Sequence, residues 1–225
     1  MDMGKLPLGC GSLDAMLDGG VEPGCLTLIY GEAGTGKTTL CLILARDMAR
    51  AGKKVIYIDT EGVSLERLRQ ICGEDFESVV RNILFSSISG FDEQERMVDK
   101  AIKLVQGNLD VGLVIVDSIS MHYRLTSREE ERGDRKSLAG QSTKLTNLAR
   151  ERSIPVVATS QVYTDVETGT YEALGGHALL HNAKMIVRVD KAGPGGKRRA
   201  VLMKARHLPE GLEADFSLTF NGISC

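Results

Sequence analysis

The sequence GEAGTGKT at residues 31–38 constrains the fold of this chain more than any other feature. It fits the pattern GxxxxGK(S/T) at every position and stands between an apolar run at residues 26–30 and a stretch with helical spacing at residues 37–50. A loop in this context wraps its backbone around phosphates, while Lys37 reaches the β and γ oxygens and Thr38 offers a hydroxyl to Mg²⁺. The motif therefore predicts a site for ATP and Mg²⁺.

The residues predicted to surround the nucleotide belong to this loop and to the start of the helix that follows it. They are Gly31, Glu32, Ala33, Gly34, Thr35, Gly36, Lys37, Thr38 and Thr39. The alternative is a glycine-rich turn that only connects a strand to a helix. That alternative leaves the burial of a Lys–Thr pair as an unexplained energetic cost.

The alternation of short apolar runs and amphipathic helical stretches continues along the chain. Further apolar runs lie at residues 54–59, 83–85, 113–117 and 155–159. Continuous apolar strands of this kind are buried on both faces of a parallel sheet. We therefore expect an α/β fold with a mostly parallel, twisted sheet, helices on both faces, and the ligand at the carboxyl ends of the strands.

The pattern changes after residue 161. Strands are expected near residues 184–189, 198–205 and 216–220, with the turns GPGG at 193–196 and PEG at 209–211 between them. This spacing predicts an antiparallel, C-terminal extension of the main sheet. Because 225 residues lie within the range of one α/β domain, we expect residues 1–225 to form a single domain.

Composition limits the classes of partner and compartment. The 28 lysines and arginines against 30 aspartates and glutamates give a net charge of −2, so binding to nucleic acid requires a local basic strip. Five cysteines without a CxxC pair argue against a disulfide framework and a Cys-rich zinc site. The chain has no run of about 18 apolar residues and no signal-peptide order at its start, so we expect no membrane association and a cytoplasmic location.

Three polar side chains follow predicted strands on the expected ligand side of the sheet. Asp117 ends an apolar strand, where a carboxylate can orient the water shell of Mg²⁺, although an aspartate there can also simply form a turn. Glu61 is a candidate general base near the γ-phosphate, with a solvated loop carboxylate as the alternative. Gln161 can orient the γ-phosphate or be a surface amide.

These motifs, in this order, resemble the RecA-like recombinases, and specifically their archaeal and eukaryotic branch. The resemblance rests on five segments, at residues 8–39, 57–62, 112–124, 154–162 and 174–183. In turn they are similar to the family's phosphate loop with its preceding helix, its catalytic-glutamate segment, its Walker B strand, its switch strand and the return from its second DNA-binding loop. The fold implied is a RecA-like P-loop NTPase core.

The resemblance also implies roles for individual residues. Glu61 becomes the carboxylate that activates water, Gln161 the γ-phosphate sensor, and Lys37 the cation that neutralises charge during hydrolysis. Arg67 becomes a stacking partner for adenine. The chain is one residue shorter than the family pattern between Gly62 and Glu66, so an ordinary surface arginine stays open as the alternative for Arg67.

Two basic segments are candidates for DNA contacts. The first lies where the family has its first DNA loop and includes Arg128, Arg132, Arg135 and Lys136, although neighbouring glutamates also fit a solvated helix with i,i+4 pairs. The second, beside the GPGG turn, includes Lys197, Arg198 and Arg199. Because few aromatic residues accompany them, binding should depend on backbone phosphates and on salt.

The family core begins near residue 8, so we expect neither the helical DNA-binding domain nor the tethering segment of full-length recombinases, and the second loop at 162–175 is short. These departures favour an accessory protein that binds ATP and DNA, hydrolyses ATP slowly and modulates the cell's main recombinase. Expected partners are DNA, with single strands favoured, the main recombinase, a junction-resolving nuclease and a weakly associated second copy, at the nucleoid in the cytoplasm. The alternatives are an ATP-gated regulatory module without turnover and a clock-type or small-molecule P-loop ATPase.

Overall fold

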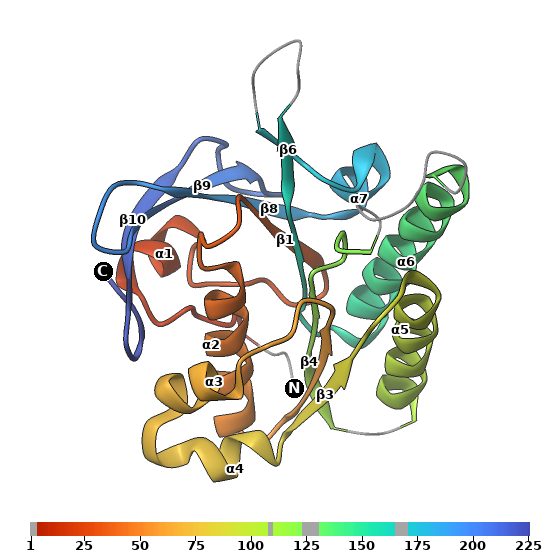
Figure 1. Cartoon of the computed structure of the whole chain (residues 1–225), viewed down its shortest axis with the longest axis horizontal. Helices are drawn as coiled ribbons and strands as arrows, with labels where there is room; N and C mark the ends of the chain where they lie inside the picture. Colours follow the sequence, from red (N-terminus) through yellow and green to blue (C-terminus); the bar gives the residue numbers. More distant parts are fainter. Residues whose placement is uncertain (1–3, 108–109, 123–130, 165–170) are drawn as a thin grey trace.

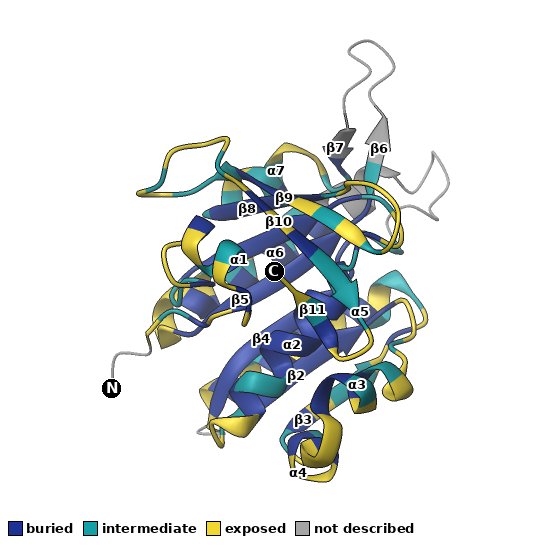
Figure 2. Ribbon diagram, turned by 90° about the vertical axis from the view of Figure 1, so that its left-hand side faces the viewer, coloured by how far each residue is buried: buried dark blue, intermediate teal, exposed yellow. Residues whose placement is uncertain are grey.

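The computed structural model describes residues 4–107, 110–122, 131–164 and 171–225. Within these ranges, a nine-stranded sheet forms the centre of the molecule, with strand order β11-β10-β9-β8-β1-β5-β4-β2-β3 (Figure 1). Figure 2 shows that the strands at its middle are buried and that exposed residues gather on the outer helices and loops. The predicted α/β architecture is confirmed.

The sheet is parallel from β8 to the edge strand β3, as the apolar runs predicted. The strands of this parallel part are β1 (Leu26–Tyr30), β2 (Lys54–Asp59), β3 (Ile83–Ser87), β4 (Val111–Asp117), β5 (Val156–Ser160) and β8 (Met185–Lys191). Because parallel strands end at the same edge, the residues that follow β1, β2, β4 and β5 come together there.

The C-terminal part of the sheet is antiparallel, which confirms the predicted extension. It consists of β9 (Lys197–Lys204), β10 (Glu213–Thr219) and β11 (Gly222–Ser224) together with β8, which is antiparallel to β9 on one side and parallel to β1 on the other. A separate two-stranded sheet consists of β6 (Val162–Thr164) and β7 (Tyr171–Ala173). The antiparallel extension lies directly beside the strand that leads into the phosphate loop, since β8 pairs with β1.

Helices cover both faces of the sheet (Figure 1). Those on one face are α1 (Gly11–Met16), α2 (Lys37–Arg50), α3 (Leu65–Cys72) and α4 (Phe76–Val80), with the short 3-10 helix η1 (Gly73–Asp75) between the last two. Those on the other face are α5 (Phe91–Gln106), α6 (Glu131–Arg152) and α7 (Gly176–Asn182). Successive strand residues alternate between the two cores, as Ile115 and Val116 of β4 do.

Local sequence signals explain where two of these helices begin and end. At α3, the Ser64 hydroxyl accepts a hydrogen bond from the Arg67 backbone N–H, and the helix stops at Gly73, whose φ is +61°. At α5, Asp92 and Glu93 lie in the first turn, where they complement the positive end of the helix dipole. Although α6 has 22 residues, neither it nor any other helix among the described residues is long and apolar enough to cross a membrane.

The two ends of the described chain are joined covalently. Cys10, just before α1, forms a disulfide with Cys225, and nearby the Ser12 hydroxyl donates to the Asp215 carbonyl of β10 at 2.9 Å. The odd number of cysteines argued against a disulfide framework, so this bond was not expected from the sequence. Sequence spacing cannot reveal a pair separated by 215 residues, because their approach depends on the position of α1 against β10.

Candidate nucleotide-binding site

The phosphate loop connects β1 to α2 at the carboxyl edge of the sheet, and two of its glycines are required, one by close packing and one by its backbone conformation. A side chain at Gly31 would place its Cβ 2.2 Å from the Val189 carbonyl oxygen of β8. At Gly36, where φ is +102°, the Cβ would lie 2.7 Å from Leu218 of β10. The loop is therefore shaped by the antiparallel extension as well as by its own sequence.

Lys37 lies inside this loop. Its ammonium donates to the Gly31 and Glu32 carbonyl oxygens, both at 2.8 Å, and the residue is only 6% exposed. Burial lowers the pKa of Lys37, and the nearby carboxylates of Glu61 and Asp117 act in the opposite direction. The ammonium is held where the motif requires a cation for the phosphate oxygens.

Asp117 ends β4 and is buried, with donors on both carboxylate oxygens. The Tyr57 hydroxyl donates to Oδ2 at 2.7 Å and the Thr159 hydroxyl donates to Oδ1 at 2.5 Å. Burial raises the pKa of Asp117, while hydrogen bonds from Thr159, Tyr57 and Thr38 act to lower it. The structure thus brings together Thr38 and Asp117, the two residues predicted to serve Mg²⁺, and their donor set of hydroxyl and carboxylate oxygens suits that ion.

Glu61 and Gln161 meet although 100 positions separate them in the sequence. The Gln161 side-chain amide donates to Glu61 Oε1 at 3.3 Å, and the Ser118 hydroxyl donates to the same oxygen at 2.7 Å. Gln161 is only 9% exposed, so the alternative of a surface amide is wrong. Sequence reasoning missed Ser118, whose only signal was its position directly after Asp117.

The backbone that carries Glu61 is fixed from two sides. The Asp59 carboxylate accepts hydrogen bonds from the backbone N–H groups of Glu61, Gly62 and Val63. The Thr60 hydroxyl accepts from the Ser118 N–H and donates to the Ser118 carbonyl, both at 2.8 Å. The turn after β2 is therefore tied to the turn after β4, which places the Glu61 carboxylate on the side of the loop lysine.

Arg67 of α3 is bound to the turn between β10 and β11. Its guanidinium donates to the backbone carbonyls of Thr219, Phe220 and Gly222 at 2.9, 2.7 and 3.2 Å. Burial lowers the pKa of Arg67. These contacts fix the orientation of the guanidinium beside the extension, and stacking on adenine stays a prediction.

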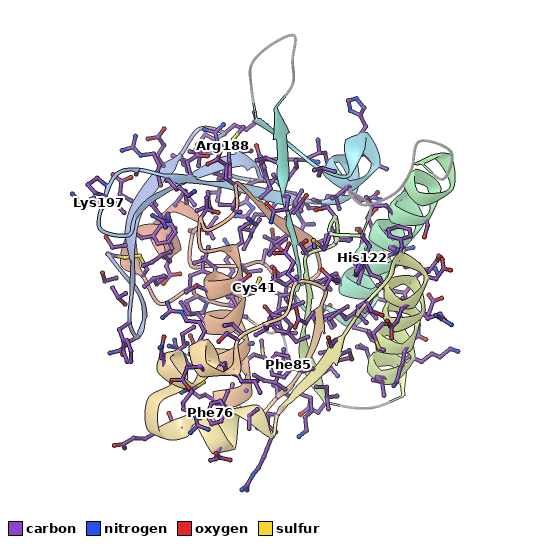
Figure 3. All side chains as sticks on the ribbon, in the orientation of Figure 1. Cys41, Phe76, Phe85, His122, Arg188 and Lys197 are labelled. Atoms are coloured by element: carbon purple, nitrogen blue, oxygen red, sulfur yellow. A yellow bond between two sulfur atoms is a disulfide. The ribbon has the colours of Figure 1, made fainter. Side chains whose placement is uncertain are left out.

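The basic residues of the β8–β9 turn have different surroundings. Lys197 is exposed and lies at the outer edge of the molecule in Figure 3. Arg198 instead donates to the carbonyls of the phosphate loop, and Arg199 forms ion pairs with Asp215 and Glu213 at 2.8 and 3.3 Å. Of the first basic segment, Arg128 and the side chains of Arg132, Arg135 and Lys136 lie outside the described part of the chain.

A phosphate loop set against a buried aspartate, at the carboxyl edge of a mostly parallel sheet with an antiparallel extension, defines a RecA-like fold. The chain belongs to the Rad51 family, whose model matches residues 2–225. The family predicted from the five sequence segments is therefore confirmed.

Sequence comparison finds similar proteins from archaea. The DNA repair and recombination protein RadB of Methanococcoides burtonii is 41% identical over 216 residues, which cover 95% of each chain. The protein of the same name from Archaeoglobus fulgidus is 40% identical over 221 residues, or 97% of each chain. A solved crystal structure of the RadB recombinase superposes with a TM-score of 0.84 at 38% identity, over 97% of this chain and 98% of that one.

The buried hydroxyl of Tyr57 should stabilise the charged form of Asp117. We expect Tyr57→Phe to lower the free energy of unfolding by about 1–3 kcal/mol at pH 7, because a buried carboxylate loses one donor. The lost donor raises the folded-state pKa of Asp117 further, so the penalty applies above that pKa and shrinks as falling pH protonates the carboxyl group. Urea denaturation at several pH values measures this; a penalty independent of pH would attribute the loss to packing instead.

Proposed function

We propose that this protein is an ATP-dependent accessory of DNA repair and homologous recombination, which binds ATP with Mg²⁺ and DNA and modulates the cell's main recombinase. The observation that carries the proposal is the meeting of Lys37, Asp117, Glu61 and Gln161 at one edge of the sheet. The name that the archaeal relatives bear, DNA repair and recombination protein, supports the biological context.

Binding and hydrolysis divide between these residues. The loop backbone and Lys37 would hold the phosphates, and Thr38 and Asp117 would hold Mg²⁺, which would supply positive charge to the triphosphate. Glu61 orients a water molecule for in-line attack and accepts its proton. Gln161, which lies between β5 and β6, contacts the γ-phosphate and so couples its presence to the position of β6. Ser118 and Gln161 both donate to Glu61 Oε1, which orients the carboxylate, so the proton of the attacking water would pass to Oε2.

A regulatory module that uses ATP occupancy without turnover is the second candidate. The same two hydrogen bonds favour it, because they give Glu61 a structural role that needs no chemistry. In both readings we propose a single ATPase core that associates weakly with itself, favours single-stranded DNA, and works at the nucleoid with the main recombinase and a junction-resolving nuclease.

The phosphate loop is tested by Lys37→Ala. We expect the affinity for MgATP to fall at least about 100-fold, because a buried cation that faces the phosphates is lost. Isothermal titration calorimetry measures this. The control is Lys53→Ala, which removes a partly exposed lysine paired with Asp110 at the opposite edge of the sheet and should leave the affinity unchanged. Equal affinities for wild type and Lys37→Ala would refute an ATP site in this loop.

Glu61→Gln distinguishes a protein that hydrolyses ATP from a regulatory module that only binds it. If Glu61 is the general base, the variant should bind MgATP normally and hydrolyse it about 10²–10⁴-fold more slowly, which a phosphate-release assay in the presence of DNA measures. Complementation of a repair-deficient strain gives the second readout. Loss of repair with retained binding supports the enzyme, whereas full repair by the variant favours the module.

DNA binding at the β8–β9 turn depends on Lys197, because Arg198 and Arg199 are engaged within the protein. We expect Lys197→Ala to weaken binding to a single-stranded oligonucleotide. The slope of the logarithm of the association constant against the logarithm of salt concentration should also become less steep, by the contribution of about one phosphate contact. Fluorescence anisotropy from low to high salt measures both, with Lys53→Ala as the control. Identical salt slopes for wild type and Lys197→Ala would remove this turn from the DNA site.

A further inference from the structure

The antiparallel extension contacts the phosphate loop along its outer side. The Val189 carbonyl of β8 leaves no room for a side chain at Gly31, and the Leu218 side chain of β10 lies against Gly36. These are apolar and backbone contacts, which limit the space available to the loop. They do not by themselves orient its peptide groups.

Arg198 of β9 adds a directional contact. Its Nη2 donates to the Gly34 carbonyl at 2.9 Å and its Nε donates to the Thr35 carbonyl at 3.2 Å. The remaining terminal nitrogen, Nη1, donates to the Lys197 carbonyl at 2.8 Å, which fixes the guanidinium on its own strand. One planar cation therefore holds two successive carbonyls of the loop from outside.

These two contacts determine where the following amides point. In a planar trans peptide unit, the C=O of one residue and the N–H of the next are directed to opposite sides. With the carbonyls of Gly34 and Thr35 turned toward β9, the N–H groups of Thr35 and Gly36 are turned away from it, into the loop. Neither of these N–H groups donates to an acceptor in the part of the chain that the structure describes.

We propose that Arg198 is a positioning residue for nucleotide binding, which aims the N–H groups of Thr35 and Gly36 at the phosphates before the nucleotide arrives. The inference rests on the proposed ATP site and adds a residue that the phosphate-loop motif does not contain. It also moves Arg198 from the DNA contacts to the nucleotide site. Unpaired N–H groups held in one concave loop form an anion site, and pre-orientation reduces the entropy lost on binding.

The matched control is the next residue on the same strand. Arg199 faces away from the loop and pairs with Asp215 and Glu213, so Arg199→Ala removes the same side chain and charge without touching Gly34 or Thr35. A conservative variant, Arg198→Lys, keeps the charge but replaces the forked donor with a single ammonium. Comparing the two changes at position 198 separates orientation of the loop from attraction by charge.

The experiment measures the affinity of each variant for MgATP and MgADP by calorimetry without DNA, together with urea unfolding. We expect Arg198→Ala to weaken both nucleotides about tenfold, because the loop amides contact the α- and β-phosphates that the two nucleotides share. Arg198→Lys should fall between Arg198→Ala and wild type, and Arg199→Ala should stay within about twofold of wild type.

Three results would overturn the inference while leaving the ATP site intact. They are wild-type affinity in Arg198→Ala, full recovery in Arg198→Lys, which would mean that charge alone suffices, and a loss confined to MgATP, which would indicate action on the γ-phosphate. If Arg198→Ala does not fold, the comparison of Arg198→Lys with wild type decides. Absence of MgATP binding by the wild-type protein would instead refute the proposed function itself.

Discussion

Two opposite charges, on Lys37 and Asp117, are buried at the carboxyl edge of the sheet, and the surrounding structure is arranged around them. Burial lowers the pKa of the lysine and raises that of the aspartate, so removal from water disfavours the charged form of each. The cost is offset by directed partners: two loop carbonyls for the ammonium, and the hydroxyls of Tyr57 and Thr159 for the carboxylate. β1, β2, β4 and β5 must therefore keep their register at this edge.

The same requirement explains the polar network beyond the two charges. Asp59 and Thr60 fix the turn after β2, Ser118 joins that turn to the end of β4, and Gln161 brings in the residue after β5. Each bond satisfies a polar group that the sheet would otherwise leave unpaired at its edge. The consequence is that Glu61 is positioned by three strands at once, and a displacement of any one of them reaches its carboxylate.

The antiparallel extension has more contacts with the candidate nucleotide site than its sequence indicated. β8 and β10 limit the space of the phosphate loop, β9 supplies Arg198 to its carbonyls, and the turn after β10 binds Arg67. Of the three basic residues that the sequence assigned to DNA at this hairpin, Lys197 is exposed, Arg198 holds the phosphate loop and Arg199 forms ion pairs. The proposed nucleotide and DNA sites therefore depend on two neighbouring residues of β9, Arg198 and Lys197.

The sequence by itself determined the phosphate loop, the α/β class, the boundaries of β1 and β2, and the family, because these depend on short motifs and on apolar periodicity within about ten residues. It also predicted that Asp117, Glu61 and Gln161 lie together, since strand ends in a parallel sheet share one edge. Only the tertiary structure decided that Tyr57 and Thr159 donate to Asp117, that Ser118 holds Glu61, that Arg198 faces the phosphate loop, and that Cys10 pairs with Cys225. Those contacts join residues 42 to 215 positions apart, and strand order and side-chain direction, which no local pattern encodes, bring them together.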